Sequence, residues 1–324
     1  MRAPKHWADG GPLTALLTPL GWLYDLAGVL RFWLTRPVDC GVPVLCVGNL
    51  VAGGAGKTPV ALALAERLLE QGFAVHFLTR GYGGRERGPL RVEPARHGAR
   101  EVGDEALLLA ALAPTWVARD RVAGARAAIT EGARVIVMDD GFQNPRLAKT
   151  LSLIVLDGAY RLGNGRVLPA GPLRERPSRA LKRAQGVALL GGEGEDWAKG
   201  LAGGLPLIAA TLTPTPEAQG LTGRRLLAFA GIGRPDKFFA SLKDAGAELV
   251  AQEAFPDHHP YGGDEVAALL ARAKSLEAQA ITTEKDRVRL PPDLASQVEV
   301  LPVAVAWRDP AEVDALLGKL FDWA

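Results

Sequence analysis

Cysteine and net charge are both scarce in this chain, and each scarcity excludes a class of protein. The 324 residues include only two cysteines, Cys40 and Cys46. Two are too few for a disulfide framework or for a zinc site built from cysteine alone, so a reducing compartment is favoured. Positive and negative charges nearly cancel, with 38 Lys and Arg against 36 Asp and Glu. The resulting net charge of +2 gives no support for nucleic acid as a partner.

Internal repeats are also missing, and the composition is that of a folded protein. Hydrophobic residues make up 48% of the chain and charged residues 23%, a balance that excludes wholesale disorder. The 38 glycines and 23 prolines indicate many turns and loops rather than a coiled coil. At roughly 100–200 residues per domain, the length predicts two domains.

Charge is nearly absent from the N-terminal region, where Asp25 and Arg31 are the only charged residues between Pro12 and Leu34. A bilayer span needs about 20 mostly apolar residues, and each central charge costs roughly 2.5–3.5 kcal/mol. These two charges and Pro19 therefore disfavour a span, and no signal-peptide cleavage site follows. Apolar residues recur at three- and four-residue spacing, which predicts a helix with one apolar face: Leu13, Leu16, Leu17, Leu20, Leu23, Ala27, Leu30 and Leu34.

Two interpretations of this helix stay open from its residues alone. It could lie in a membrane interface, with the rings of Trp7, Trp22 and Trp33 at the level of the lipid headgroups. It could instead pack its apolar face on the core of the chain itself, which is the commoner use of such a stripe.

Strands and helices alternate along the rest of the chain, which predicts a mainly parallel sheet covered by helices on both faces. We divide the chain into an N-terminal helical region (1–40), a larger α/β domain (41–215) and a smaller C-terminal α/β domain (216–324). A stretch rich in Thr, Pro and Gly, residues 211–223, is predicted to link the two domains. The predicted elements are strands at 42–47, 74–79, 134–138, 151–156, 226–230 and 280–283, and helices at 59–69, 105–112, 121–131, 235–245, 264–275 and from 311.

A glycine-rich stretch from Gly48 to Thr58 lies between a predicted strand and a predicted helix. Glycines let backbone N–H groups turn toward a phosphate, and a helix N-terminus adds a positive dipole end. Lys57 would supply a charge to the β- and γ-phosphates, and the Thr58 hydroxyl suits Mg²⁺. The pattern departs from a strict P-loop because Val51 occupies the position of its first glycine. The Gly-Gly-x-Gly-Lys-Thr form belongs to a related group of nucleotide-binding loops.

Two carboxylates follow a buried strand directly: the run RVIVM leads into Asp139 and Asp140. Ligands bind at the carboxyl ends of strands in open α/β sheets. Because the chain also has a phosphate-binding loop, this pair predicts a Mg²⁺ site rather than a helix cap.

Acid–base candidates are fewer, and each has a structural alternative. Asp104 and Glu105 open a predicted helix, where acidic residues are favoured as caps. His258 and His259 form a local concentration in a loop of the second domain, where a histidine could orient a general base on the first domain. The segment TTEKD (282–286) is predicted to be a polar turn.

Several motifs occur together in order: VGNLVAGGAGKTP, RGYGG, VGDE, MDDGFQ, GNGRVLPAGPLRE, AGIGRPDKFF, FPDHHPY and TTEKD. In this combination the chain resembles the tetraacyldisaccharide 4'-kinase family over nearly its whole length. The resemblance implies an ATP- and Mg²⁺-dependent kinase that phosphorylates the 4'-hydroxyl of an acylated glucosamine disaccharide 1-phosphate in lipid A synthesis. It also implies two α/β units and a monotopic helix on the cytoplasmic face of the inner membrane.

The resemblance also implies a role for each matching residue. Asp104 is the candidate base, with His258 as its partner and Lys57 at the transferred phosphate. Asn49, Arg80 and Tyr82 would lie toward the lipid substrate. Thr58, Asp139 and Asp140 would hold Mg²⁺, and Arg174 and Glu175 would contact phosphate or metal. The nucleotide would be bound by Val51, Ala52, Gly53, Gly54, Ala55, Gly56, Lys57 and Thr58.

Two competing functions are weaker. Dimeric switch ATPases of the partition or metal-insertion type share the loop form, but they carry a second lysine immediately before the paired glycines, where this chain has Ala52. A membrane-surface module that uses nucleotide only structurally would leave Asp104 and His258 unexplained. The sequence leaves the oligomeric state open.

Overall fold

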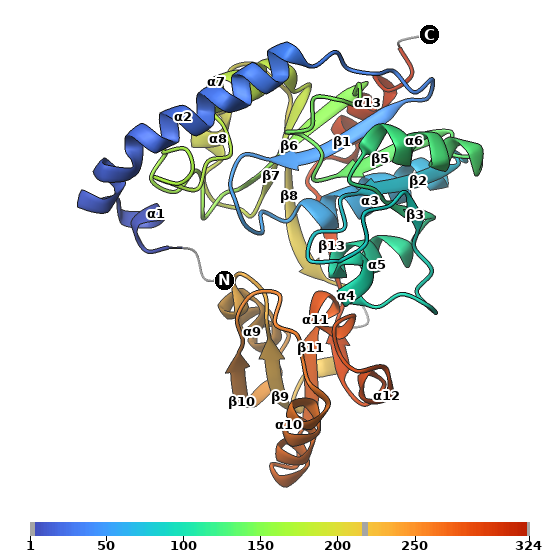
Figure 1. Ribbon diagram of the computed structural model, residues 1–324. Coiled ribbons are helices and arrows are strands. Elements are labelled where there is room, and N and C mark those ends of the chain that lie inside the picture. Colours follow the sequence, from blue (N-terminus) through green and yellow to red (C-terminus); the bar gives the residue numbers. More distant parts are fainter. Residues whose placement is uncertain (1–3, 216–219, 323–324) are drawn as a thin grey trace.

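The computed structural model describes residues 4–215 and 220–322 and contains two sheets (Figure 1). The larger has nine strands in the order β13-β8-β7-β6-β1-β5-β2-β4-β3, and the smaller has four in the order β10-β9-β11-β12. This confirms the predicted α/β class with a second, smaller unit. The strands are β1 (Val44–Asn49), β2 (Val75–Thr79), β3 (Leu90–Arg91), β4 (Thr115–Val117), β5 (Val135–Asp139), β6 (Leu151–Asp157), β7 (Gly186–Leu190), β8 (Leu207–Pro214), β9 (Arg225–Ala230), β10 (Glu248–Ala254), β11 (Gln279–Thr283), β12 (Glu299–Leu301) and β13 (Val303–Trp307).

The helices cover both faces of the larger sheet and flank the smaller one (Figure 1). They are α1 (His6–Asp9), α2 (Pro12–Leu34), α3 (Lys57–Glu70), α4 (Ala99–Val102), α5 (Asp104–Ala110), α6 (Arg121–Thr130), α7 (Pro177–Ala180), the 3₁₀ turn η1 (Leu181–Arg183), α8 (Glu195–Ala202), α9 (Pro235–Asp244), α10 (Gly263–Ser275), α11 (Glu284–Arg287), α12 (Pro292–Ala295) and α13 (Pro310–Gly318).

The central strands of the larger sheet are parallel, and only the edge strands β3 and β13 pair antiparallel with their neighbours. Alternate residues of each central strand enter two different cores. In β1, Cys46 packs with α6 and α8 on one face, whereas Leu45 and Val47 pack with α3 and α13 on the other. Such continuous burial is typical of parallel sheets with helices on both faces.

The end of the chain returns to the larger sheet, which differs from the predicted division at residue 216. β13 pairs with β8 from Val303 against Pro214 to Trp307 against Ala210, and α13 packs on the same face as α3. The first residues of the predicted linker, 211–214, therefore belong to a sheet strand, and residues 216–219 lie outside the described residues. β8 lies between β7 and the edge strand β13, and threonine is common in strands, so the composition of this segment did not indicate a linker.

The two units meet through ion pairs near the carboxyl end of the large sheet. Asp157, at the end of β6, accepts from Arg234, and its Oδ2 atom lies 3.6 Å from Lys237 Nζ of α9. A second group of contacts joins α5 to α11 and to the loop 255–261. These contacts bring charged side chains of the second unit to the carboxyl edge of the larger sheet.

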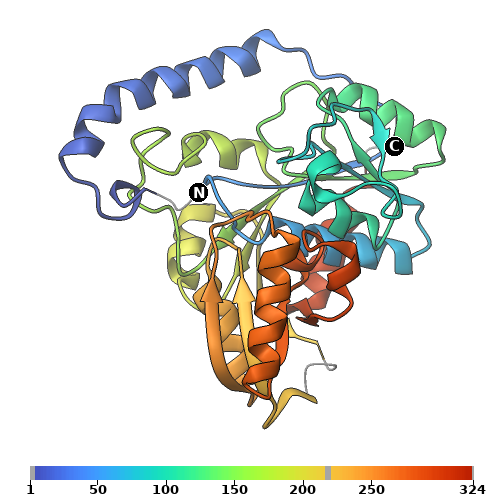
Figure 2. The ribbon, with the colours of Figure 1, turned by 60° about the horizontal axis from the view of Figure 1, so that its bottom comes forward.

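The predicted N-terminal helix is present as α2, and it lies along the outside of the larger unit (Figure 2). By length and composition this 23-residue helix is apolar enough to cross a membrane. Only 17% of its most apolar 18-residue window is buried in the protein. Most of its predicted apolar face is exposed: Leu16 is 73% and Leu23 62% exposed. Asp25 is buried and pairs with Arg176 and Arg179, so the charged side of the helix faces the protein.

Candidate functional site

The glycine-rich loop connects β1 to α3 and is open to solvent at Gly53 and Gly54. Gly53 has φ +115°, and a Cβ atom at either position would meet nothing within 4 Å. Gly56 has φ +77°, and its Cβ would lie 2.3 Å from Leu190 Cδ1. Glycine is therefore favoured at 53 and 56, where the chain turns into the N-terminus of α3, and a helix N-terminus after such a turn is suited to binding an anion.

Asn49 lies inside this loop, not toward a lipid as the resemblance implied. The side chain is fully buried, and its Nδ2 donates to Val51 O at 2.8 Å and Gly53 O at 3.4 Å. Asn49 therefore braces the loop backbone. Its buried Oδ1 atom has no hydrogen-bond partner among the described residues.

Asp139 ends β5 beside the loop, and its carboxylate is set up for a cation. The Thr58 hydroxyl donates to Oδ2 at 2.8 Å, while the buried Oδ1 lacks a hydrogen-bond partner within the described ranges. Burial, followed by the charge of Glu105, raises the pKa of Asp139 to about 7. A buried carboxylate oxygen without a donor is costly unless a cation compensates it. This donor set fits the predicted Mg²⁺, which takes oxygen ligands and keeps several waters.

Asp140 has φ +54° and turns its carboxylate toward two cations. Arg174 Nη1 lies 2.6 Å and Lys57 Nζ 3.7 Å from its Oδ1 atom. Burial on its own would raise the pKa of Asp140, but Lys57 and Arg174 hold it below its ordinary value. Lys57 of the glycine-rich loop and Arg174, which was predicted to contact phosphate or metal, therefore both bind the carboxylate of Asp140.

Glu175 has a different setting from the metal contact that the resemblance implied. Arg183 Nη2 donates to both of its oxygens, at 2.9 and 2.7 Å, and Gln143 Nε2 donates to Oε1 at 3.1 Å. Gln143 also donates to Asn49 O at 3.1 Å. Glu175 thus ties the 163–183 loop to the strand that leads into the phosphate loop, and these donors already satisfy its carboxylate.

Asp104 and His258 come from different units and meet at the site. His258 Nδ1 lies 2.9 Å from Asp104 Oδ2, and Asp104 Oδ1 accepts from the backbone N–H of Glu105 at 2.9 Å. This confirms that a loop histidine of the second unit faces a carboxylate of the first. Burial alone would raise the pKa of Asp104, yet the hydrogen bond from His258, and then Lys285, hold it below its ordinary value. Asp104 is therefore ionised at neutral pH.

Two charged residues of this cluster were not predicted. Lys285 Nζ lies 3.4 Å from Glu105 Oε1, and Arg289 Nε lies 3.4 Å from Asp104 Oδ2. Lys285 belongs to the TTEKD segment, whose predicted polar turn is the helix α11. The only signal was the density of charge in that segment. Its proximity to Asp104 depends on how the units pack, which the local sequence does not encode.

A third unpredicted residue, Arg121, is buried at the start of α6. Its Nε atom lacks a hydrogen-bond partner in the described part of the chain. Burial, followed by the charge of Arg80, lowers the pKa of Arg121 to about 10. Arg80 itself is exposed, as expected for a substrate contact.

Tyr82 lies at the rim of the cluster. Its side chain is 63% exposed, and its ring meets the His258 ring edge-on with centroids 5.6 Å apart. This places an exposed aromatic surface directly beside the Asp104–His258 pair, the position expected of a residue that contacts an apolar substrate.

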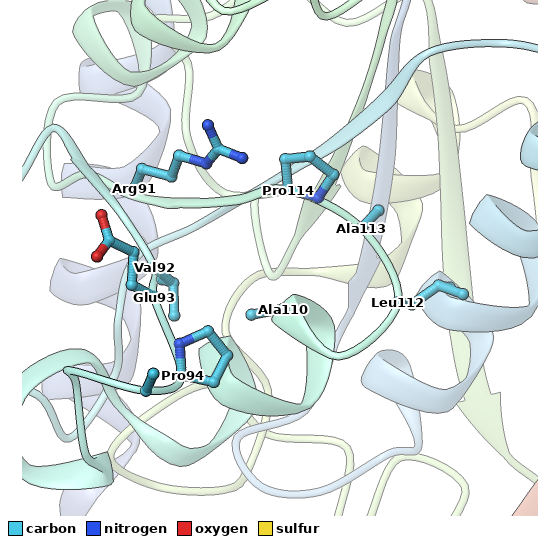
Figure 3. Close-up of a pocket in the computed structure, with 9 residues that line it drawn as sticks. Arg91, Val92, Glu93, Pro94, Ala110, Leu112, Ala113 and Pro114 are labelled. Carbon is cyan, nitrogen blue, oxygen red and sulfur yellow. The ribbon is translucent and has the colours of Figure 1, made fainter.

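A shallow hollow of about 630 Å³ lies elsewhere on the larger unit (Figure 3). None of its lining residues belongs to the site above, and Arg91 and Glu93 are its only charged ones. Its other lining residues are Val92, Pro94, Ala95, Ala110, Leu112, Ala113 and Pro114.

Similarity to known proteins covers nearly the whole chain. The model of the tetraacyldisaccharide-1-P 4'-kinase family matches residues 13–322. The tetraacyldisaccharide 4'-kinase of Rhodospirillum centenum is 56% identical over 99% of this chain and 97% of its own length. The protein of the same name from Rhodospirillum rubrum is 51% identical over 99% of this chain and 98% of its own length.

The fold also matches a solved structure. The crystal structure of an "apo" form of LpxK from Aquifex aeolicus in complex with ATP aligns with a TM-score of 0.74 and 25% sequence identity. The alignment covers 95% of this chain and 99% of that one.

Proposed function

The chain belongs to the tetraacyldisaccharide-1-P 4'-kinase family, and from this premise we propose that it transfers the γ-phosphoryl group of ATP to the 4'-hydroxyl of an acylated glucosamine disaccharide 1-phosphate in lipid A synthesis. The observation that carries the proposal is that one edge of the sheet holds both halves of such a reaction. The open glycine loop lies with Lys57 and Asp139 at the start of α3. Helix α5, which begins with Asp104, contacts α3, and Asp104 meets His258 of the second unit there.

The loop residues supply the nucleotide half. Backbone N–H groups around Gly53 to Gly56 would bind phosphate oxygens, and Lys57 would move from Asp140 to the β- and γ-phosphates. Asp139, Asp140 and Thr58 would hold Mg²⁺, which neutralises charge on those phosphates when it is bound. Arg174, 2.6 Å from Asp140, is placed to take part in the same neutralisation.

Asp104 supplies the acceptor half. Its carboxylate would accept the proton of the sugar hydroxyl, while the Nδ1–H of His258 and the backbone N–H of Glu105 keep it oriented. Phosphoryl transfer leaves little covalent work to the protein, so this orientation and the surrounding positive charge would account for most of the rate.

The outer face of α2 would bring the site to its substrate. Ten large apolar side chains of α2 are exposed, and the charged residues Asp25 and Arg31 face the protein. A helix of this kind lies in a membrane interface. Because ATP is a cytoplasmic substrate, that interface would be the cytoplasmic face of the inner membrane.

The test is transfer of label from γ-³²P-ATP to the acylated disaccharide phosphate in mixed micelles, comparing the parent with Asp104→Ala. We expect the variant to lose turnover about 10²–10⁴-fold with little change in ATP affinity, because Asp104 acts on the sugar hydroxyl. Glu66→Ala, an exposed carboxylate of α3, is the matched control and should leave turnover unchanged. Absence of label on the disaccharide with the parent protein would refute the proposed reaction, and full turnover in Asp104→Ala would refute the role of Asp104.

A further inference from the structure

The guanidinium of Arg183 lies where three parts of the larger unit meet. Arg183 closes the 163–183 segment in the 3₁₀ turn η1, and 31% of its side chain is exposed. Its Cζ atom lies 4.2 Å from the centre of the Phe32 ring in the last turn of α2, and 4.9 Å from the centre of the Phe142 ring in the loop after β5. Its Nη2 atom donates to both carboxylate oxygens of Glu175, at 2.9 and 2.7 Å. One side chain therefore contacts α2, the loop after β5 and the segment that holds Glu175.

From Glu175 the contacts continue to the phosphate loop. Gln143 Nε2 donates to Glu175 Oε1 at 3.1 Å and to Asn49 O at 3.1 Å. Gln143 Oε1 accepts from Arg174 Nη1 at 3.4 Å, and the same nitrogen lies 2.6 Å from Asp140 Oδ1. A displacement of the Glu175 carboxylate would therefore disturb both the residue that contacts the loop backbone and the guanidinium that is placed to neutralise phosphate charge.

Phe142 gives one side of this arrangement a firm support. The residue is 2% exposed, and a Cβ atom at Gly48 would lie 2.3 Å from Phe142 Cβ, so Phe142 packs directly against β1. Phe32 belongs instead to α2, whose outer side chains are exposed. A guanidinium within about 6 Å of the centre of an aromatic ring is attracted to the face of that ring. Arg183 thus joins a fixed part of the core to the docked helix.

The chemistry of these contacts suits arginine in particular. A planar guanidinium can donate to a carboxylate along its edge while its face lies against aromatic rings. A lysine ammonium would keep the charge, but it has no planar face to lie against the rings. We propose that Arg183 is a positioning residue that fixes Glu175 and links the phosphate-binding side of the site to the docked position of α2.

The inference rests on the proposed kinase activity, and its test is a double-mutant cycle on kcat in mixed micelles. We expect Arg183→Lys to lower kcat about tenfold and to change the KM for either substrate less than twofold, because Arg183 acts through Glu175 on groups at the phosphates. In Glu175→Gln the same substitution should cause less than a twofold further loss, because the carboxylate through which it acts is gone. A merely structural defect would add its full tenfold loss in both backgrounds. Arg126→Lys, at an exposed position of α6, is the matched control and should follow the parent throughout.

Phe32→Leu tests the link to α2, because it keeps an apolar side chain on the helix but removes the ring that contacts Arg183. We expect binding to phosphatidylethanolamine–phosphatidylglycerol vesicles to stay within twofold of the parent, kcat to fall about threefold, and this loss to disappear in the Arg183→Lys background. An unchanged kcat in Arg183→Lys, or equal losses in the parent and Glu175→Gln backgrounds, would overturn the role of Arg183. An unchanged kcat in Phe32→Leu, or a loss that persists in Arg183→Lys, would overturn the link to α2. A parent protein without transfer activity would instead refute the proposed function.

Discussion

The helices α2 and α3 have similar apolar periodicity and opposite surroundings. In α3 the apolar stripe packs on the large sheet, and Leu64 is fully buried. In α2 the stripe faces away from the protein, with Leu16 73% and Leu23 62% exposed. The buried residues of α2 include Gly21 and Asp25, which a soluble helix would normally expose or avoid.

The comparison teaches that an apolar stripe does not specify what it packs against. α2 is attached to the protein by polar contacts: Asp25 pairs with Arg176 and Arg179, and the guanidinium of Arg183 lies 4.2 Å from the centre of the Phe32 ring. Those arginines belong to the loop that also carries Arg174 and Glu175. The helix therefore docks on the 163–183 segment with its charged side and leaves its apolar side exposed.

The largest effect that distinguishes the two helices should be on the free energy of unfolding. Leu64→Ala should lower the free energy of unfolding by about 3 kcal/mol, because it leaves a cavity between α3 and the sheet. Leu23→Ala, the same substitution on α2, should change it by less than about 0.5 kcal/mol. Urea denaturation followed by circular dichroism measures both. Equal losses in the two variants would mean that α2 packs on the core after all.

The next effect concerns lipid binding, which we expect to depend on the exposed face of α2. Leu23→Ser should weaken binding to vesicles of phosphatidylethanolamine and phosphatidylglycerol by about 2 kcal/mol, roughly 30-fold, because a leucine leaves the lipid interface. Leu212→Ser is the matched control, since Leu212 is also exposed but lies on β8 of the larger sheet. Vesicle sedimentation gives the partition coefficients. Unchanged binding of Leu23→Ser would contradict a lipid contact of this face.

Local sequence was enough for the parts of the molecule that depend on local physics. Periodicity located α2, α3 and the strands β1, β2, β5 and β6, but not β7 or β8. The Gly-Lys-Thr sequence after a strand located the phosphate loop. The carboxyl-end rule placed Asp139 beside Thr58, where the structure has a 2.8 Å hydrogen bond. Each of these follows from the residues of one or two adjacent elements.

The rest depends on contacts between distant segments. Glu175 and Arg183 are close in sequence, but only the fold shows that their ion pair satisfies the carboxylate expected to bind metal. Lys285 and Glu105 are 180 residues apart and meet only where the two units pack. The pairing of β13 with β8 likewise joins two distant segments of the chain. Neither segment has a strong local pattern that predicts this pairing.

The smallest effect tests how α2 is attached. Asp25 is 5% exposed, but Arg176 and Arg179 are 55% and 34% exposed, so solvent screens the pairs. Asp25→Asn should therefore cost only about 1 kcal/mol, and amide hydrogen exchange in α2 should become about fivefold faster while exchange in α3 is unchanged. Asp244→Asn, at the exposed end of α9, is the control. If exchange in α2 does not accelerate, the polar face is not what docks the helix, and the contrast between α2 and α3 loses its physical cause.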